Sequence, residues 1–497
     1  MPAPTLSDPS LLVQKAFIGG KWVNAQLGKT FEVQDPASGE LIGTCPECDG
    51  ADTNFAIEAA ATAFPKWRVR TGRERSRLIR RWYDLVIENK DDITALITWE
   101  NGKANPDAAG EVLFAASFLE WFSEEAARIY GDVIPHSAAG NRVSVLREPV
   151  GVCGMITPWN FPAGMMARKA AAALAAGCTC VIKTAGETPF TANALAVLAE
   201  RAGIPAGVIN IVTALENTPE IGLTLCESPV VSKISFTGST RVGKLLMRQC
   251  SGTLKKLSLE LGGNAPFIVF DDADLDTAVA GLIASKFKCT GQTCVCANRI
   301  FVQAGIHDAF VKRLVEVMGN FRVGSGFDKR VTHGPLIHSN AVGKVVEHVE
   351  DAKARGARVA LGGNRLPAQG PNFFEPTVIT GMSRDMKIAH EETFGPIAAI
   401  FRFETEEEVV KAANESEVGL AAYVFTQNLQ LSHRITESLH VGMVGLNTGV
   451  ISDAPSPFGG VKHSGLGREG SKYGLEEYTE LKTVVTGGIH TTYPSKL

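Results

Sequence analysis

The spacing of apolar and polar residues changes several times along the chain, and each change predicts a different kind of element. Between residues 50 and 128, apolar residues recur every three or four positions, as in DITALITWE and EVLFAASFLEWFSEEAARIY. This spacing predicts a run of helices. The next stretch, GDVIPHSAAGNRVSVLREPVG, is polar and rich in β-forming residues. It predicts a protruding hairpin or arm between packed parts of the molecule.

From residue 150 to 270, short apolar strands such as VGVCGMITP, CTCVIKT, GVINIVT and VSKISFTG alternate with helical segments. This alternation predicts an α/β fold with βαβ crossovers and a parallel sheet covered on both faces. Ligands of such sheets bind beyond the carboxyl ends of the strands. A second series, NAPFIVF, LDTAVAGLIASKFK, RIFVQ and HDAFVKRLVEVM, predicts a second α/β domain.

Composition and charge narrow the function classes. With 497 residues, 45% of them hydrophobic, the chain is long enough for at least two domains. Its net charge of −4, with scattered Lys and Arg, argues against nucleic-acid binding. No apolar run approaches the ~18 residues that span a bilayer, and the first fifteen residues carry no export or transit signal. We therefore expect a cytosolic protein without a membrane partner.

The chain has ten cysteines, and in a reducing compartment most of them are expected to act as small apolar residues. The pair Cys45 and Cys48 has no second ligand pair nearby, so we predict no metal site. Three others lie in FKCTGQTCVCANR, residues 287–299. Among these, Cys294 follows the small, polar stretch TGQT, which would leave its thiol accessible in a turn. Such a thiol becomes a strong nucleophile once its pKa is lowered.

Two motifs at strand ends are candidates for binding a nucleotide. FTGSTRVG ends a strand and opens a helix, and Gly238 and Gly243 would let the backbone approach a phosphate there. A plain strand-to-helix turn is the alternative. Lys183 ends the strand VIK, where a cation can hold ribose hydroxyls or a ribose phosphate. The alternative for Lys183 is a solvated lysine.

Two further residues are candidates for catalysis. Glu260 follows an apolar strand and precedes two glycines, so its carboxylate would be partly desolvated. Partial burial raises a carboxyl pKa towards the range of a general base, although an ordinary strand end is the alternative. Asn160 lies in the stiff, Pro-flanked loop TPWNFP, where its side-chain amide could donate to a developing oxyanion.

Taken together, TPWNFP, VIK, FTGST, LELGG, GQTC and EETFGP resemble the aldehyde dehydrogenase superfamily in order and spacing, over nearly the whole chain. GQTCVCANR and PFGGVKHSGLGREGSKYGLEEY look most like its succinate-semialdehyde dehydrogenases. The resemblance implies a Rossmann-type cofactor domain, a catalytic domain and a strand arm that builds a homotetramer, with a dimer as the alternative. These would comprise residues 1–130 and 150–257, residues 258–470, and residues 131–149 and 471–497, respectively.

The resemblance also implies the roles of the site residues. Cys294 would attack the aldehyde carbon to give a thiohemiacetal, while Asn160 and the Cys294 backbone N–H hold the oxyanion. After hydride transfer to the cofactor, Glu260 would deprotonate the water that hydrolyses the thioester. The product from succinic semialdehyde would be succinate. The implied cofactor contacts are Trp159, Lys183, Gly238, Ser239, Glu392 and Phe394.

Gly186 bears on the choice of cofactor. Many relatives that use NAD carry a glutamate three residues after the ribose lysine, and its carboxylate repels a 2′-phosphate. Here that position is Gly186, and the glutamate has moved to Glu187. Lys183 would then be free to pair with phosphate. We therefore predict NADP as the preferred cofactor, with NAD as the alternative.

Three residues would bind a substrate carboxylate by the same resemblance: Arg168, Lys288 and Ser452. Lys288 replaces the arginine usual in close relatives, so the charge is kept but the bidentate fork is lost, and Cys289 replaces an asparagine. The alternative for Arg168 is that it forms an ion pair with an acid at the surface. The alternative substrates are glutarate semialdehyde and a broad range of aliphatic and amino aldehydes. One methylene is worth only ~1–3 kcal/mol in a pocket.

Cys296 lies two positions from the predicted nucleophile. A thiol there can close a small, strained and easily reduced disulfide, so we predict a reversible oxidative switch between Cys294 and Cys296. Cys289 is predicted to be a buried bystander. The rival function classes are a thiol acyltransferase or hydrolase without a redox cofactor, against which Lys183 and the FTGST turn argue, and a nucleotide-binding structural protein.

Overall fold

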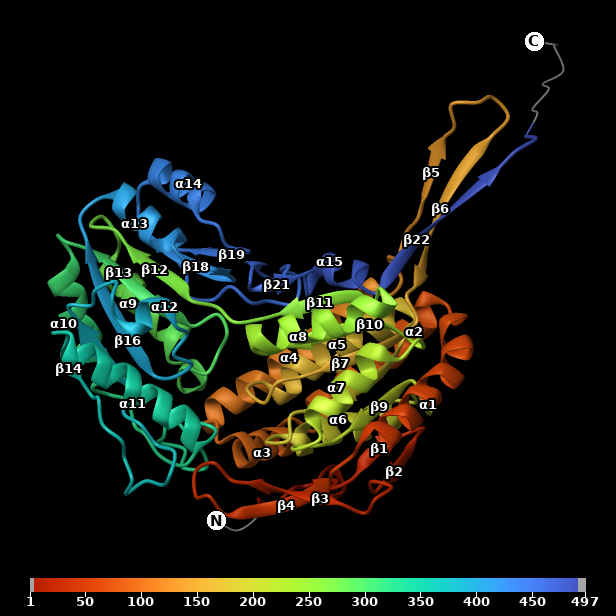
Figure 1. Cartoon of the computed structure of the whole chain (residues 1–497), viewed down its shortest axis with the longest axis horizontal. Helices are drawn as coiled ribbons and strands as arrows, with labels where there is room; N and C mark the ends of the chain where they lie inside the picture. Colours follow the sequence, from red (N-terminus) through yellow and green to blue (C-terminus); the bar gives the residue numbers. More distant parts are fainter. Residues whose placement is uncertain (1–3, 490–497) are drawn as a thin grey trace.

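The computed structural model describes residues 4–489, which form two large sheets and a third sheet that protrudes from the body (Figure 1). The first sheet has eight strands in the order β2-β1-β9-β8-β7-β10-β11-β21, and the five from β9 to β11 are parallel. Their near-continuous apolar sequences suit a sheet buried on both faces. The strands are β1 (Ala16–Ile18), β2 (Lys21–Val23), β7 (Val152–Ile156), β8 (Thr179–Lys183), β9 (Ile209–Val212), β10 (Val231–Thr237), β11 (Lys256–Glu260) and β21 (Gly465–Leu466).

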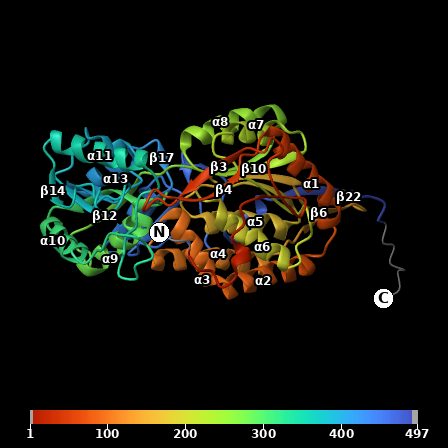
Figure 2. The ribbon, with the colours of Figure 1, turned by 90° about the horizontal axis from the view of Figure 1, so that it is seen from below.

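Helices cover both faces of this sheet (Figure 2). Buried residues of α2 to α6 share one apolar core with the sheet, and those of α7 and α8 share another on the opposite face with most of the buried residues of α1. The helices are α1 (Gly50–Arg68), α2 (Gly72–Glu88), α3 (Lys90–Asn101), α4 (Asn105–Glu125), α5 (Pro162–Ala176), α6 (Pro189–Arg201), α7 (Thr218–Glu227) and α8 (Thr240–Cys250). The helical run and the strand-helix alternation predicted from the sequence are both confirmed.

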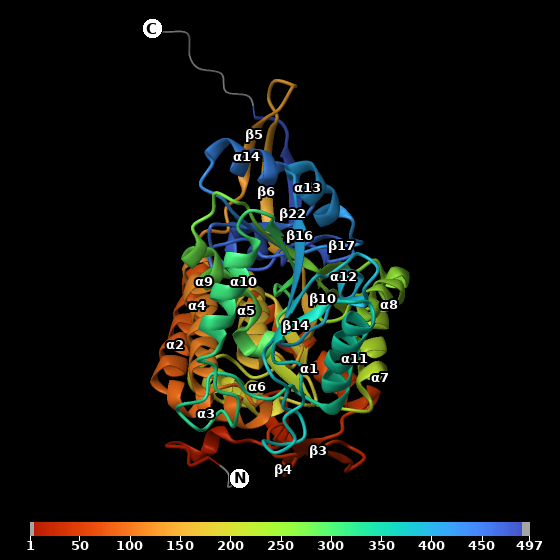
Figure 3. The same cartoon turned by 90° about the vertical axis from the view of Figure 1, so that its left-hand side faces the viewer.

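The second sheet has seven strands in the order β14-β15-β16-β13-β12-β18-β19, parallel except for β14. Figure 3 shows α10 and α11 on opposite sides of β16. The strands are β12 (Ala265–Val269), β13 (Ala297–Gln303), β14 (Arg358–Leu361), β15 (Thr377–Thr380), β16 (Ile397–Phe403), β18 (Ala421–Phe425) and β19 (Met443–Leu446). The helices are α9 (Leu275–Lys286), α10 (His307–Met318), α11 (Ser339–Ala354), α12 (Lys387–His390), α13 (Glu406–Asn414) and α14 (Leu429–Ser438).

The third sheet is antiparallel and projects away from the body, as the sequence predicted for an arm (Figure 1). It consists of β5 (Asp132–Pro135), β6 (Arg142–Pro149) and β22 (Thr479–Thr486). The predicted arm segment 471–497 begins too early, because α15 (Ser471–Glu476) packs against α4 and α5. Residues 490–497 of that segment lie outside the described residues. Smaller elements are β3 (Thr30–Gln34), β4 (Leu41–Pro46), β17 (Val418–Gly419), β20 (Val461–Lys462), η1 (Pro9–Leu11), η2 (Ser251–Thr253) and η3 (Lys288–Gly291).

The chain passes from the first sheet to the second directly after β11. The predicted boundary between residues 257 and 258 is wrong, because it falls inside β11, which pairs with β10 along its length. β21 later returns from the second half and pairs with the end of β11 at Glu260. Both crossings lie at the carboxyl ends of the first sheet's strands, which is where ligands of parallel sheets bind.

Candidate active site

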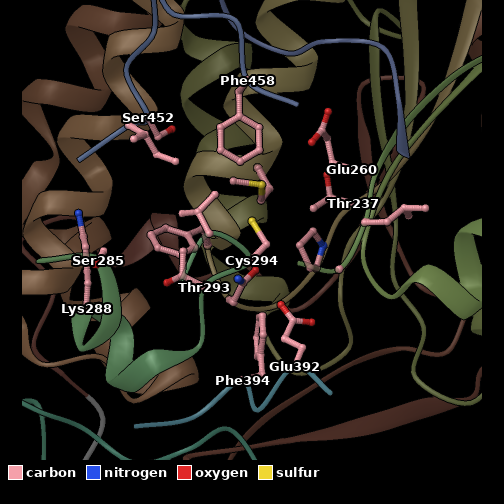
Figure 4. Close-up of a pocket in the computed structure, with 18 of the residues that line it drawn as sticks. Thr237, Glu260, Ser285, Lys288, Thr293, Cys294, Glu392, Phe394, Ser452 and Phe458 are labelled. Carbon is pink, nitrogen blue, oxygen red and sulfur yellow. The ribbon is translucent and has the colours of Figure 1, made fainter. Parts of the chain in front are cut away.

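A cavity of about 340 Å³ lies where the two large sheets meet (Figure 4). Its lining comes from the loop after β7, the amino end of α8, the end of β11, the turn before β13 and the segment 449–458. Eleven of the fifteen site residues predicted from the sequence line it, and the exceptions are Lys183, Gly186, Gly243 and Cys296. Residues up to about 300 positions apart in the chain therefore converge on one cavity.

Cys294 lies near the centre of the cavity and its sulfur points into it (Figure 4). The turn is closed by the Cys296 backbone N–H, which donates to the Thr293 carbonyl at 3.0 Å. Gly263 allows this close approach, because a Cβ there would lie 2.6 Å from the Cys294 carbonyl oxygen. Burial raises the pKa of the thiol, and Glu392 adds to the effect. The thiol is therefore protonated at neutral pH, and its attack on an aldehyde requires a base.

Glu260 ends β11 opposite Thr237 and is 2% exposed. Neither carboxyl oxygen has a hydrogen-bond partner within the described protein, although both are buried. Burial, together with the nearby Glu469, raises the pKa of Glu260 well above its usual range. An unpartnered buried carboxyl is costly to keep in a fold, and such groups gather at functional sites.

Asn160 lies between β7 and α5 and is 6% exposed. Its side-chain nitrogen donates to the Gln292 carbonyl at 2.9 Å, two residues before Cys294. A primary amide has two N–H donors, so this bond orients the amide and leaves its second N–H for a ligand in the cavity.

Glu392 and Phe394 approach the cavity from the loop after α12 (Figure 4). One Glu392 carboxyl oxygen accepts a hydrogen bond from the Gly263 N–H at 3.3 Å. Burial raises the pKa of Glu392 to about 7. Phe394 has a left-handed backbone (φ +55°), and its ring lies 5.7 Å from that of Trp159 in an edge-to-face arrangement. A left-handed non-glycine residue is strained and frequently marks a ligand site.

Lys183 and Gly186 lie at the carboxyl end of β8, further along the same sheet edge. The alternative that Lys183 is solvated is wrong, since it is 2% exposed and donates to the Thr184 carbonyl at 2.6 Å. Burial lowers the pKa of Lys183 to about 8, and Glu187 and Glu47 oppose the effect. A Cβ on Gly186 would lie 2.7 Å from the Leu215 side chain and 3.0 Å from the Ala214 carbonyl oxygen.

The amino end of α8 opens towards the cavity. Ser239 is exposed and caps the helix, accepting a hydrogen bond from the Val242 N–H at 3.4 Å. A Cβ on Gly238 would collide with the Phe236 ring at 2.4 Å. The expectation that Gly243 admits a phosphate is wrong, because Gly243 is buried against Leu261, 2.4 Å from where its Cβ would lie. Gly243 instead lets α8 pack closely against the Leu261 side chain.

The three predicted carboxylate-binding residues line the cavity, and Figure 4 shows Ser452 and Lys288 on the side away from Glu260. Arg168 is 2% exposed and donates to Ser452 Oγ at 3.2 Å and to Glu469 at 3.4 Å. The alternative of a surface ion pair is therefore wrong about the surface, although Arg168 does pair with an acid. Lys288 is exposed at the wall, and Figure 4 shows it on the same side as Ser452.

Comparison with known proteins identifies the fold and the family. The model of the aldehyde dehydrogenase family matches residues 22–484. The chain belongs to this family. It is 52% identical to glutarate-semialdehyde dehydrogenase of Pseudomonas aeruginosa, over 97% of this chain and 100% of that protein. It is 55% identical to succinate-semialdehyde dehydrogenase [NADP(+)] 1 of Schizosaccharomyces pombe, over 97% and 96%. An NADP-dependent enzyme of E. coli has a TM-score of 0.96 at 51% identity, over 97% and 100%.

The site of this aldehyde dehydrogenase fits the dinucleotide cofactor that its family uses. The hydroxyls of Thr184 and Thr237, at the ends of β8 and β10, are buried without a hydrogen-bond partner in the described residues. The amino end of α8 presents free backbone N–H groups, which favour a phosphate. Lys183, Ser239 and Glu392 lie along the same edge. Within residues 4–489 no cluster of three His, Cys, Asp or Glu could hold a metal, and no helix there is long and apolar enough to cross a membrane.

Sequence reasoning missed Glu469, the acid that pairs with Arg168 beside the cavity. Glu469 is 5% exposed and receives hydrogen bonds from Arg168 and Lys169. Lys169 also donates to Ser235 at 3.1 Å, so the group bridges α5 and β10. Glu469 belongs to PFGGVKHSGLGREGSKYGLEEY, one of the stretches on which the resemblance rests. A buried Arg168 would need an acidic partner, and the acids of this stretch were the candidates.

The other two cysteines of the stretch 287–299, Cys289 and Cys296, are buried. Cys296 is 7% exposed and donates to the Lys286 carbonyl at 3.5 Å, and both Cys294 and Cys296 are free thiols in this structure. The switch between them stays a prediction. Cys289 is 3% exposed, as expected for a buried residue, and contacts the Asn160 carbonyl oxygen at 3.8 Å.

Proposed function

We propose that this aldehyde dehydrogenase oxidises succinic semialdehyde to succinate, with NADP as the preferred cofactor and NAD as the alternative. The observation that carries the proposal is that Arg168, Lys288 and Ser452 all line the cavity that holds Cys294, with Arg168 donating to Ser452 and Lys288 on the same side as Ser452. Two cationic side chains and a hydroxyl in the lining of a small cavity favour a substrate that carries an anionic group besides its aldehyde. The name of the S. pombe relative supports the same substrate.

Glutarate semialdehyde is the second candidate, because the P. aeruginosa relative carries that name. Arg168 is held by Glu469 and Ser452, whereas Lys288 is exposed and has a flexible stem. A single ammonium on such a stem can meet a carboxylate at more than one distance. Discrimination between four- and five-carbon substrates would then be worth only ~1–3 kcal/mol.

NADP preference is supported by the surroundings of Gly186. A glutamate at this position would bring its Cβ against Leu215 and the Ala214 carbonyl, and its carboxylate would repel a 2′-phosphate. Among residues 4–489, the Lys183 ammonium has the Thr184 carbonyl as its only hydrogen-bond partner. A buried ammonium with a spare donor suits a phosphate.

The chemistry follows from the protonation states of the site residues. Cys294 must lose its proton before it attacks the aldehyde carbon, and the buried carboxyl of Glu260 is the strong base that its raised pKa provides. The free N–H of the Asn160 amide and the Cys294 backbone N–H would then donate to the oxyanion of the thiohemiacetal. When bound, NADP supplies the hydride acceptor. Glu260 then releases the thiol proton to solvent and, as a carboxylate again, deprotonates the water that hydrolyses the thioester, which frees the product acid and the Cys294 sulfur.

The arm supports a proposal about assembly. Its strands expose Val133, Leu481 and Val485, which are 70%, 65% and 55% exposed. Apolar edge strands of this kind are normally covered by another chain, so we propose a homotetramer in which a second copy covers the arm. We also propose that residues 1–130 and 150–260 bind the cofactor and that residues 261–470, except for the returning β21, form the catalytic domain. The cytosolic location stays a prediction.

The test is the rate of NADPH or NADH formation, followed at 340 nm under reductant. Succinic semialdehyde, glutaric semialdehyde and butyraldehyde are each assayed with NADP and with NAD. The proposal requires the highest kcat/KM with succinic semialdehyde and NADP. Equal kcat/KM with butyraldehyde would mean that the three wall residues do not bind a carboxylate. Equal values for the two cofactors would refute the NADP preference.

A further inference from the structure

The loop that carries Asn160 is held from outside the cavity by charged and amide side chains of the helical layer. Asn101, at the end of α3, donates to the Trp159 carbonyl at 2.9 Å. Lys103, two residues later, donates to the Asn160 carbonyl at 2.6 Å. Both carbonyls that flank the Asn160 Cα are therefore fixed by neighbouring residues of one short segment.

Glu111 of α4 completes this arrangement. It is 0% exposed and pairs with the Lys103 ammonium, while its other carboxyl oxygen accepts from the Ala163 N–H at 2.9 Å and the Gly164 N–H at 3.3 Å. These N–H groups belong to the first turn of α5, whose cap residue makes no side-chain hydrogen bond. Glu111 thus caps the amino end of α5, and Lys103 binds the Asn160 carbonyl. Together they fix the backbone on both sides of Phe161.

The backbone at Gly102 and Lys103 is tightly packed. A Cβ on Gly326 would lie 2.1 Å from the Lys103 carbonyl oxygen, and one on Gly334 would lie 2.0 Å from the Gly102 carbonyl oxygen. Backbones from the second half of the chain therefore press directly on residues 102 and 103. The Lys103 ammonium also lies 3.7 Å from the centre of the Phe161 ring, and the side chain is 1% exposed. The ammonium is therefore buried between the Phe161 ring and the Asn160 carbonyl that it binds.

We propose that Lys103, with Asn101 and Glu111, forms a positioning group that sets the oxyanion donor of Asn160, an inference that rests on the proposed aldehyde oxidation. None of the three residues lines the cavity, so none touches the reacting atoms. Their contribution is geometric, because the Lys103 charge is offset by Glu111. With the backbone held on both sides and one amide N–H bound to Gln292, the second N–H keeps a single direction towards the cavity.

Lys103 cannot be tested by a single neutral substitution, because that would leave Glu111 as an unpaired buried charge, which is strongly destabilising. The variant is therefore Lys103→Met with Glu111→Gln. Glutamine keeps an oxygen that accepts from the first turn of α5, and methionine fills the lysine stem's space. A second, independent variant is Asn101→Leu, which removes only the contact to the Trp159 carbonyl. The control is Lys233→Met with Glu477→Gln, which removes another buried ammonium together with its acidic partner, at a site away from this loop.

The readouts separate oxyanion positioning from general damage. Aldehyde oxidation forms an oxyanion, whereas alkylation of Cys294 by iodoacetamide forms none. We expect kcat/KM to fall about 10–100-fold in both loop variants, since losing an oxyanion donor costs ~10²–10³-fold and misplacing it costs less. The loss should be equal for succinic semialdehyde and butyraldehyde. The alkylation rate should stay within about 3-fold of wild type, and the control variant Lys233→Met with Glu477→Gln should retain wild-type kcat/KM.

Three results would overturn the positioning role. The first is kcat/KM within about 3-fold of wild type in both loop variants. The second is a parallel fall in alkylation, which would indicate collapse around Cys294. The third is a larger loss with succinic semialdehyde than with butyraldehyde, which would place the damage at the carboxylate side. A wild-type enzyme that oxidises no aldehyde would instead refute the proposed function.

Discussion

The buried ammonium of Lys183 makes the affinity for NADP depend on pH in a defined direction. Its pKa is lowered to about 8, chiefly by burial, so the group is charged below that pH and neutral above it. The 2′-phosphate of NADP has a second pKa near 6, so it stays doubly charged between pH 7 and 9. Raising the pH over this range therefore removes the lysine charge and leaves the phosphate charge unchanged.

The size of the effect follows from the titration. With a pKa of about 8, about nine tenths of Lys183 is charged at pH 7 and about one tenth at pH 9. If only the charged form pairs with the phosphate, the Kd for NADP rises about tenfold, or about 1.4 kcal/mol. NAD has no 2′-phosphate, so its Kd should change by less than about twofold.

Titration of the enzyme with each cofactor, followed by quenching of protein fluorescence at constant salt, measures both constants. Lys183→Arg is the matched control, because a guanidinium stays charged at pH 9 and should flatten the NADP curve. The reasoning is refuted if NADP and NAD weaken equally with pH, or if the arginine variant keeps the tenfold rise.

Three further predictions concern the reacting groups. Because the pKa of Glu260 is raised, kcat should rise with pH as this carboxyl loses its proton. Glu260→Gln should lower kcat ~10²–10⁴-fold and abolish that rise. A pH–rate profile of both enzymes checks the two expectations. Lys288→Met, an exposed substitution, should raise KM about 10-fold for succinic semialdehyde and less than 2-fold for butyraldehyde; equal shifts would exclude carboxylate binding. Cys296→Ala should lose less reductant-recoverable activity after mild peroxide than wild type; identical recovery would remove Cys296 from the switch with Cys294.

Most of the helices and strands could be predicted from the local spacing of apolar and polar residues. The alternation between residues 150 and 270 placed the strand ends that hold Asn160, Lys183 and Glu260, because strand and helix periods are local properties of the sequence. Cys294 and Glu260 were identified because each lies where a turn with small residues leaves a side chain free. Residues 1–49 were not resolved into elements beforehand, because their strands are short and lack a clear period.

Contacts between distant residues were the part that sequence reasoning missed. Arg168 and Glu469 are 301 positions apart, and no spacing rule links them. The burial of Lys183, the packing of Gly243 against Leu261, and the grip of Lys103 on Asn160 depend in the same way on tertiary structure. The domain boundary was misplaced because β11 looks the same in sequence whether it ends one sheet or begins the next.

The most direct test of the proposed chemistry is to trap the acyl intermediate. The wild-type enzyme is mixed with succinic semialdehyde and NADP, quenched in acid within the first turnover, and analysed by intact mass and peptide mapping. The mechanism predicts a succinyl group on Cys294, with one NADPH formed for each succinyl group. No adduct, or a succinyl group on Cys289 or Cys296 in place of Cys294, would contradict it.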